Sequence, residues 1–324
     1  MELKNRTILI TGGTGFVGST IANKLINQNY KVEIISTTSK NLWRIENREK
    51  CKFYYVDLRD KQELSKCIDT IQPDIIFHLA AYVNPERDYY TIEHSFSTNF
   101  NGTKNLLEAL FDYNYDVFIN TGTCEEYGTN KSPFKEIYRE NPVSPYATSK
   151  IASTYFCEMM ANTYDKPIIT VRPFLAYGPK QISKLLIPSH FYHGFENKKI
   201  ILTPAEQTRD FIYVDDLANA YISLAKNFNK VKGMGIFNIG SGVETQIKTV
   251  VNLIKRKFND PQFQIAGKPY RKNETMHFYS SISKIKEAIG WSASWKIEDG
   301  IDATYEWWKN NKEIWYKFRK MWRE

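Results

Sequence analysis

The stretch Thr11-Gly12-Gly13-Thr14-Gly15-Phe16-Val17-Gly18 lies between an apolar, β-branched run at 6–10 and a helix-like run at Ile21–Ile26. Glycines 12, 15 and 18 would let the backbone turn tightly, approach a pyrophosphate and pack the helix on the strand. The start of that helix would offer amide donors and positive potential to phosphate groups. A glycine triplet by itself is weak evidence and fits an ordinary flexible turn. Between a strand and a helix, however, it predicts a dinucleotide cofactor site that includes Gly12, Thr14, Gly15, Phe16 and Val17.

Strand-like and helix-like segments alternate through the first half of the chain. Strands are expected at Arg6–Ile10, Lys31–Ser36, Lys52–Val56, Ile75–Leu79, Val117–Asn120 and Ile168–Arg172, and helices near 16–28, 61–71, 93–113 and 145–164. Such a βαβ rhythm predicts an α/β fold, a Rossmann doubly wound parallel sheet with helices on both faces. Ligands of these sheets bind beyond the carboxyl ends of the strands, where the strand order reverses.

The rhythm ends after Pro173. Proline and glycine become denser around 173–204, and regular elements return only at Phe211–Val214, at a helix near 215–227 and at Ile236–Ile239. We therefore predict two parts, a dinucleotide-binding Rossmann domain and a smaller C-terminal α/β substrate lobe. Their expected bounds are 1–173, with 209–240 returning, for the domain, and 174–208 with 241–324 for the lobe.

A second pattern is Tyr146-Ala147-Thr148-Ser149-Lys150, which opens a predicted helix. The spacing of four places the phenol and the ammonium on one helical face. A free tyrosine titrates near pH 10, and positive charge from the lysine and from an oxidised nicotinamide favours the phenolate. Tyr146 can then take or give a proton at a carbinol carbon while hydride moves. Such a pair in isolation would more often be two surface residues. Together with the glycine loop it predicts redox catalysis by Tyr146 and Lys150.

The end of the second predicted strand bears on the choice of cofactor. It reads Ser36-Thr37-Thr38-Ser39-Lys40, whereas NAD-binding domains usually hold the ribose diol with a carboxylate near this point. Ser36 fills that place, and hydroxyl groups with Lys40 or Arg44 could accept a 2′-phosphate instead. We therefore favour NADP(H), with Ser36, Thr37 and Lys40 among its contacts. NAD(H) is the alternative if these residues form only a solvated loop.

Composition argues against several other classes of protein. The net charge is +8, but lysines and arginines are spread along the chain without a nucleic-acid motif, so we expect no nucleic-acid partner. The four cysteines, at 51, 67, 124 and 157, have neither metal-ligand nor disulfide spacing, so we expect no metal site. No apolar run is long enough to span a bilayer and no signal peptide is recognisable. These features lead us to expect a cytoplasmic protein.

With both motifs in place, the sequence resembles the extended short-chain dehydrogenase/reductase family of NAD(P)-dependent nucleotide-sugar epimerases, dehydratases and ketoreductases, over nearly the whole chain. The resemblance implies that the C-terminal lobe binds a nucleotide-diphosphate sugar. It implies a homodimer through the helices that begin near Ile92 and Tyr146. It also implies cofactor contacts from residues in segments similar to the family's motifs, namely Asp57, Leu58, Leu79, Ala80, Ala81, Asn99, Tyr146, Lys150 and Pro173.

The same resemblance assigns residues that would face the sugar nucleotide. Thr123 falls where the family keeps the Ser or Thr that hydrogen-bonds the reacting oxygen, and Arg209 where an arginine meets the phosphates. Arg271 and Glu274 resemble a pair, usually Arg and Asp, that holds the diphosphate and the nucleotide ribose. Arginine suits phosphate because its planar fork binds two oxygens at once.

The residues after Thr123 bear on the net reaction. Glu125 stands where dehydratases and decarboxylases of the family carry a glutamate base, and Cys124 where many 4,6-dehydratases have an aspartic acid. We expect both near the substrate, with Glu125 as a further catalytic candidate. The alternative is that Glu125 and Glu126 lie in a solvated turn, since carboxylates are mostly exposed.

Reduction of a 4-keto-6-deoxy sugar nucleotide is the reaction that we favour. Ser36 indicates NADPH, on which reductases draw, and segments 207–220 and 271–276 are similar to those of CDP-abequose synthase-like 4-ketoreductases. An epimerase or a 4,6-dehydratase that recycles its cofactor is the alternative. A cofactor-binding regulator without catalysis is a remote one, because fold alone does not establish activity.

The C-terminus carries Ile314, Trp315, Phe318 and Trp322 at helical spacing, with basic residues beside them. This stripe predicts a helix that packs on the substrate lobe or on a partner subunit. A helix that lies on a membrane surface is the less favoured alternative.

Overall fold

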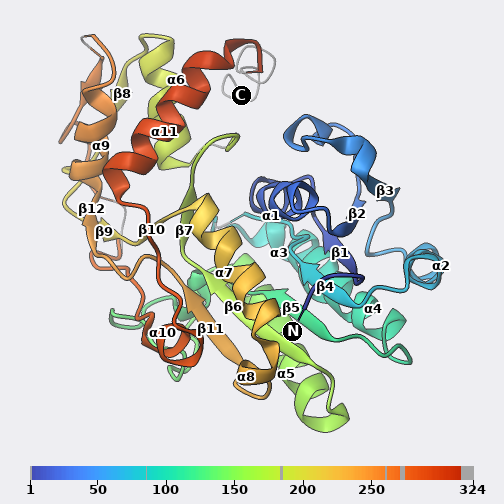
Figure 1. Cartoon of the computed structure of the whole chain (residues 1–324). Coiled ribbons are helices and arrows are strands. Elements are labelled where there is room, and N and C mark those ends of the chain that lie inside the picture. Colours follow the sequence, from blue (N-terminus) through green and yellow to red (C-terminus); the bar gives the residue numbers. More distant parts are fainter. Residues whose placement is uncertain (1, 85, 183–184, 260, 271–273, 315–324) are drawn as a thin grey trace.

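A seven-stranded parallel sheet forms the centre of the molecule (Figure 1). The computed structural model describes residues 2–84, 86–182, 185–259, 261–270 and 274–314. The strands of the sheet are β1 (Thr7–Thr11), β2 (Lys31–Ser36), β3 (Cys51–Tyr55), β4 (Ile75–His78), β5 (Val117–Thr121), β6 (Ile168–Pro173) and β11 (Ile236–Ile239). They follow the order β11-β6-β5-β4-β1-β2-β3, so the order reverses between β4 and β1. The sheet confirms the predicted Rossmann α/β fold and places the expected ligand site at this reversal.

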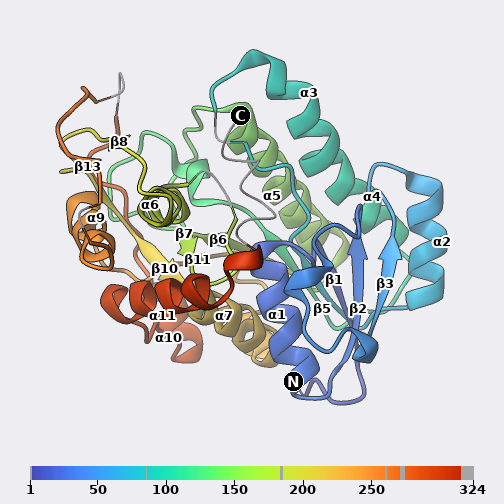
Figure 2. The same ribbon diagram turned by 90° about the horizontal axis from the view of Figure 1, so that it is seen from above.

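Helices cover both faces of the sheet (Figure 2). The first face carries α1 (Phe16–Asn27) and α7 (Val214–Lys226), and the second carries α2 (Lys61–Ile71), α4 (Gly102–Ala109) and α5 (Pro145–Tyr164). Successive side chains of a strand point to opposite faces. Accordingly, Ile8 and Ile10 of β1 join the apolar core beneath α1 and α7, whereas Leu9 joins the core beneath α2, α4 and α5. Burial on both faces explains why these strands are continuously apolar.

The helix expected at 93–113 is divided. It begins as α3 (Ile92–Ser95), continues as the π-helical segment η4 (Phe96–Asn101) and ends as α4 at Ala109. Single-turn π-helical stretches within α-helices frequently occur at functional sites. Here the widened segment contains Asn99, one of the residues expected near the cofactor.

The second half of the chain adds a separate group of short elements. Three strand pairs are β7 (Leu175–Tyr177) with β10 (Phe211–Tyr213), β9 (Thr208–Arg209) with β12 (Thr245–Gln246), and β8 (Ile200–Ile201) with β13 (Phe263–Gln264). The remaining α-helices are α6 (Leu186–Phe195), α8 (Phe228–Val231), α9 (Ile247–Lys255), α10 (Ser283–Ile289) and α11 (Ile297–Asn310), and the 3-10 turns are η1 (Leu42–Arg44), η2 (Arg48–Lys50), η3 (Tyr89–Thr91) and η5 (Cys124–Tyr127). α6, α9 and α11 enclose an apolar core of their own. The expected domain bounds stay a prediction, although β11 does pair with β6 in the main sheet.

A buried carboxylate ties the returning chain to this second group. Asp210 accepts hydrogen bonds from the amide and hydroxyl of Ser241, from the amide of Gly242, and from the amide and hydroxyl of Ser280. Five donors satisfy the charge fully, which offsets the cost of taking it out of water. The loop after β11 and the segment before α10 are thereby held beside β9 and β10.

The C-terminal stripe is described only in part. Ile314 packs against the apolar core of the second half, whereas Trp315, Phe318 and Trp322 lie outside the described residues. Upstream, Trp307 of α11 stacks on Trp43 of η1, with 6.3 Å between ring centroids. None of the helices in the described ranges is long and apolar enough to cross a membrane.

Candidate active site

The glycine loop joins β1 to α1 under tight steric limits. Gly12 has φ +69°, and a Cβ there would lie 2.7 Å from the backbone nitrogen of Ala80, which follows β4. A Cβ on Gly18 would lie 2.4 Å from the carbonyl oxygen of Gly12. Gly15 is the N-cap of α1 and contributes no side-chain hydrogen bond, so the first amides of the helix are left without a side-chain cap. A cradle of bare backbone donors at a helix start fits the pyrophosphate of a dinucleotide.

His78, the last residue of β4, is a neutral side chain that connects the strand before this loop to α4. Its Nδ1 is 2.7 Å from Thr11 Oγ1 and its Nε2 is 2.8 Å from Thr103 Oγ1. The Thr103 hydroxyl donates to the carbonyl of Asn99, so we assign the ring proton to Nε2. Burial, with a smaller effect of Lys150, lowers the pKa of His78 to about 3. The imidazole therefore joins β1, β4 and α4 without carrying charge.

The end of β2 faces the loop through hydroxyl groups. Ser36 donates to the carbonyl of Thr38, and Thr14 Oγ1 lies 2.8 Å from Ser36 Oγ, so Thr14 is the donor of that pair. Thr37 and Lys40 are exposed. Ser36 thus contacts Thr14, a residue of the glycine loop.

Arg44 lies next to this pair and is 6% exposed. Its guanidinium donates to the carbonyls of Lys180 and Thr14, at 3.1 and 3.4 Å, and rests on the ring of Trp43. Within the described ranges no carboxylate forms an ion pair with it, and burial lowers its pKa to about 10. A buried cation that is bonded only to carbonyls fits an anionic ligand.

Other residues expected to contact the cofactor lie at or after the carboxyl ends of the strands. Leu79, Ala80, Ala81 and Pro173 follow or end strands at the carboxyl edge and are partly buried. Leu58 is buried, and its carbonyl accepts from Asn105 of α4. Asp57 is engaged by Arg59 through two nitrogen–oxygen contacts of 3.0 and 2.6 Å. That pair lowers the pKa of Asp57, so this carboxylate is charged.

Asn99 links the loop after β4 to α5. Its side-chain oxygen accepts from the amide of Tyr82, and its side-chain nitrogen donates to the carbonyl of Tyr82 and to Ser149 Oγ. Ser149 in turn donates to the carbonyl of Tyr146. Asn99 therefore acts on the site by fixing the loop after β4 against α5.

Tyr146 and Lys150 both lie in the first turns of α5 and are buried. The local sequence explains the start of this helix, since the Ser144 hydroxyl caps the amide of Ala147 and Pro145 occupies the first turn. The hydroxyl of Thr123, which follows β5, lies close enough to the phenol of Tyr146 to act on its pKa. The structure thus brings Tyr146 and Lys150 together with Thr123, the residue that the resemblance assigns to the reacting oxygen.

Burial dominates the ionisation of this group. It raises the pKa of Tyr146 above its ordinary value, the Thr123 hydroxyl opposes that rise, and nearby acidic groups add to it. Burial also lowers the pKa of Lys150 to about 8. Lys150 is therefore mostly protonated at neutral pH, and Tyr146 is a neutral phenol when no further positive charge is near.

Cys124 and Glu125 follow Thr123 in η5. The Cys124 side chain is buried, and that burial, together with Glu125 and Asp210, raises the pKa of its thiol well above the usual value. Glu125 is partly buried. Both lie on the turn that carries Thr123. That they face a substrate stays a prediction.

Sequence reasoning missed the role of Glu126. The alternative of a solvated turn is wrong for this residue, which is fully buried and pairs with Arg172 of β6 at 2.7 Å. Arg172 also pairs with Glu140. The available signal was Arg172 itself, because an arginine within an apolar strand requires a buried acid beside it.

The residues expected at the substrate phosphates lie on the second group of elements. Arg209, on β9, pairs with Glu274 at 2.6 Å and donates to the carbonyls of Thr208 and Thr275. Arg271, the other expected member, lies outside the described residues. The observed pair holds the segment after 274 against β9.

Known proteins are similar to this chain both in sequence and in structure. A sequence model of the NAD dependent epimerase/dehydratase family matches residues 8–240. The chain is 32% identical to a putative UDP-glucose 4-epimerase of Methanocaldococcus jannaschii, over 94% of this chain and 99% of that protein. It is 30% identical to dTDP-glucose 4,6-dehydratase of Escherichia coli, over 96% and 95% of the two chains. The structure of UDP-glucuronic acid 4-epimerase from Bacillus cereus in complex with UDP-glucuronic acid and NAD is similar, with a TM-score of 0.85 at 25% identity over 94% of this chain and 99% of that one.

The neutral His78 predicts a pH-dependent stability. Its imidazole titrates near 6.5 when unfolded but at about 3 when folded, so the unfolded chain binds more protons as the pH falls. The stabilising contribution is complete above pH 6.5 and is lost below it. Between pH 7 and pH 5 the free energy of unfolding of the wild type should fall by about 2 kcal/mol more than that of His78→Gln. Urea unfolding at both pH values measures this difference, and equal losses would contradict the buried neutral imidazole.

Proposed function

Because the chain belongs to the NAD dependent epimerase/dehydratase family, we propose that it moves hydride and a proton at C4 of a nucleotide-linked sugar. One observation carries the proposal: Tyr146 is buried beside the hydroxyl of Thr123 and one turn from Lys150, at the same edge of the sheet as the glycine loop. An acid–base group that is held in this way is required for oxidation or reduction at a carbinol carbon.

The glycine cradle fits a nicotinamide dinucleotide. Gly12 and Gly18 leave no room for side chains, and the start of α1 supplies amide donors for the pyrophosphate. When bound, the nicotinamide supplies or accepts the hydride. Ser36, Thr14 and Arg44 would hold the adenosine ribose at the other end.

Tyr146 gives its proton to the carbonyl oxygen in reduction, so that this oxygen becomes the C4 hydroxyl, and takes the proton back in oxidation. Thr123 shares the hydrogen bonds of that oxygen and orients it. Lys150, protonated at neutral pH, stabilises the phenolate that remains after proton donation. A neutral phenol is the form that a reductase needs, and burial of Tyr146 favours that form.

Cys124 argues against a 4,6-dehydratase. Elimination of water from the sugar needs an acid for the leaving hydroxyl, and the raised pKa of the Cys124 thiol makes it a poor one. Glu125 alone would supply only the base. We therefore propose reduction of a 4-keto-6-deoxy sugar nucleotide as the net reaction.

A second candidate is 4-epimerisation with a recycled cofactor. The names of several relatives favour it, among them the putative UDP-glucose 4-epimerase of M. jannaschii and the UDP-glucose 4-epimerase of Mycolicibacterium smegmatis. The same Tyr146, Thr123 and Lys150 would serve both reactions. They differ only in whether the reduced cofactor is used up.

For the cofactor we propose NADP(H). Support comes from Ser36 in the usual place of a carboxylate and from the buried guanidinium of Arg44, for which no carboxylate partner lies within the described ranges. Arginine near this position is a recognised partner of the 2′-phosphate. The B. cereus relative contains NAD, so the alternative is NAD(H).

The reaction test uses 4-keto-6-deoxy sugars linked to CDP, dTDP, UDP and GDP, with UDP-glucose and UDP-galactose as epimerase substrates. We expect stoichiometric loss of reduced-nicotinamide absorbance with at least one keto sugar. Tyr146→Phe should lower turnover by roughly two to four orders of magnitude, whereas Tyr115→Phe, which removes a buried phenol from the core beneath α2, α4 and α5, should retain it. Conversion of UDP-glucose without net cofactor loss would select the epimerase, and an active Tyr146→Phe would overturn the mechanism.

The cofactor test places a charge at Ser36. Ser36→Asp should lower affinity for NADPH at least about tenfold relative to NADH, because a carboxylate there repels a 2′-phosphate. Ser36→Ala removes the hydroxyl without adding charge and should change the ratio much less. Titration of both cofactors by fluorescence measures the ratios; an unchanged ratio in Ser36→Asp would refute the 2′-phosphate site.

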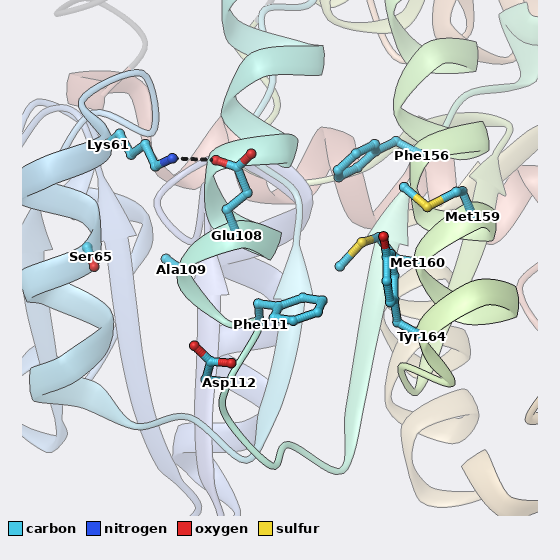
Figure 3. Close-up of a pocket in the computed structure, with 10 residues that line it drawn as sticks. All are labelled: Lys61, Ser65, Glu108, Ala109, Phe111, Asp112, Phe156, Met159, Met160 and Tyr164. Carbon is cyan, nitrogen blue, oxygen red and sulfur yellow. Dashed lines mark ion pairs between the residues drawn. The ribbon is translucent and has the colours of Figure 1, made fainter.

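We also propose a homodimer through the outer faces of α4 and α5. Phe111, which follows α4, and Tyr155, Met159 and Tyr164 of α5 are exposed, and exposed apolar patches commonly mark protein interfaces. A hollow of about 460 Å³ lies between these helices and α2. Figure 3 shows Phe111 and Tyr164 among the residues that line it. Its lining residues are Lys61, Ser65, Glu108, Ala109, Phe111, Asp112, Phe156, Met159, Met160 and Tyr164.

Two matched substitutions test this interface. Met159 is 37% exposed beside the hollow, and Met234 is 38% exposed before β11. Met159→Glu should convert a dimer to monomers, because it places a charge in an apolar contact, whereas Met234→Glu should leave the dimer intact. Light scattering after size exclusion gives the masses. A monomeric wild type, or a dimeric Met159→Glu, would contradict the proposed face.

A further inference from the structure

Glu126 contacts the two segments that carry the proposed catalytic residues, the turn with Thr123 and the helix α5. It is 0% exposed, and its carboxylate receives the Nε and terminal nitrogens of Arg172 at 2.8 and 2.7 Å. Gly122 leaves space for it, since a Cβ there would lie 2.4 Å from a Glu126 oxygen. A position this confined holds the carboxylate in one place.

The carboxylate connects the two segments that carry the reacting groups. One oxygen accepts from the amide of Thr123 at 2.8 Å, and the hydroxyl of Thr154, one turn after Lys150, lies 3.3 Å from the other. Glu126 is thereby bonded both to the turn that presents Thr123 and to the helix that presents Tyr146 and Lys150. All its partners can donate, as a charged carboxylate requires.

The buried charge acts on both titrating groups. Burial raises the pKa of Tyr146, and the Glu126 carboxylate adds to that rise. Burial lowers the pKa of Lys150, and Glu126 opposes that effect. Tyr146 is also faced by Cys124 and Glu125 from η5 and by Tyr221 from α7, and Lys150 by His78 from β4 and Cys157 from its own helix. Among these acidic groups, Glu126 is the one that acts on both Tyr146 and Lys150.

We propose that Glu126 is a positioning residue for proton transfer: it sets Thr123 against Tyr146 and keeps the Tyr146–Lys150 pair in its phenol and ammonium forms. The inference rests on the proposed role of Tyr146. It adds a function for a residue that otherwise would serve only to neutralise Arg172.

Glu140 provides a matched control. It pairs with the same guanidinium and accepts from the hydroxyl of Tyr155, on the outer side of Arg172. It has no described hydrogen bond to Thr123 or to Thr154. Glu126→Gln and Glu140→Gln therefore each remove one charge from Arg172, but only the first changes the field at Tyr146.

The experiment titrates the tyrosinate absorption of the NADP⁺-saturated protein, with the Tyr146→Phe form of each variant subtracted. Glu126→Gln keeps an oxygen for the Thr123 amide but removes the negative charge, so the midpoint of Tyr146 should fall by about one pH unit. Glu140→Gln should titrate with the wild type, although both variants lose stability. The pH profile of turnover should shift in the same direction.

Equal midpoints in Glu126→Gln and the wild type would overturn the inference, as would equal shifts in Glu126→Gln and Glu140→Gln, which would indicate a purely structural charge. A wild type without any Tyr146-dependent titration would contradict it as well. The measurement needs no sugar nucleotide, so failure of the proposed reaction is seen separately, in the turnover assay.

Discussion

The close approach of three backbone segments at the carboxyl ends of β1 and β4 is the constraint on which the site depends. Gly12 meets Ala80 and Gly18 meets Gly12 at distances that exclude a Cβ. The strand order reverses at this place, so the tight contact forms the cofactor cradle and at the same time fixes β4. His78 of β4 is hydrogen-bonded to Thr103 of α4, and Asn99 of the π-helical segment is hydrogen-bonded to Ser149 of α5.

Buried charges around this edge are of two kinds. The carboxylates of Asp210 and Glu126 receive hydrogen bonds from donors within the chain, which offset part of the cost of desolvation. Among the described residues Arg44 contacts carbonyls and the ring of Trp43 but no carboxylate, so its positive charge is not neutralised locally. This contrast separates charges that hold the structure together from one that is suited to a ligand.

Burial and nearby charge also determine the protonation state of the groups in the proposed mechanism. Burial of Tyr146 and of the Cys124 thiol keeps both protonated, whereas Lys150, with a pKa of about 8, stays mostly charged at neutral pH. Such a site has a phenol ready to donate, a cation to stabilise the resulting phenolate and no strong acid for a leaving hydroxyl. These properties fit oxidation and reduction at one carbon better than elimination.

The sequence by itself determined the parallel sheet, the glycine cradle and the Tyr146–Lys150 pair, because each follows from local spacing: apolar runs, glycines at a strand end, and two side chains four residues apart on a helix. Only the tertiary structure decided the state of the charged groups. Glu126, for which a solvated turn was one alternative, is buried, and Arg44 is an enclosed cation; both states depend on residues distant in the chain, Arg172 and Lys180. Burial and pairing are properties of the packed chain, and a local pattern contains no information about which distant side chain will complete them.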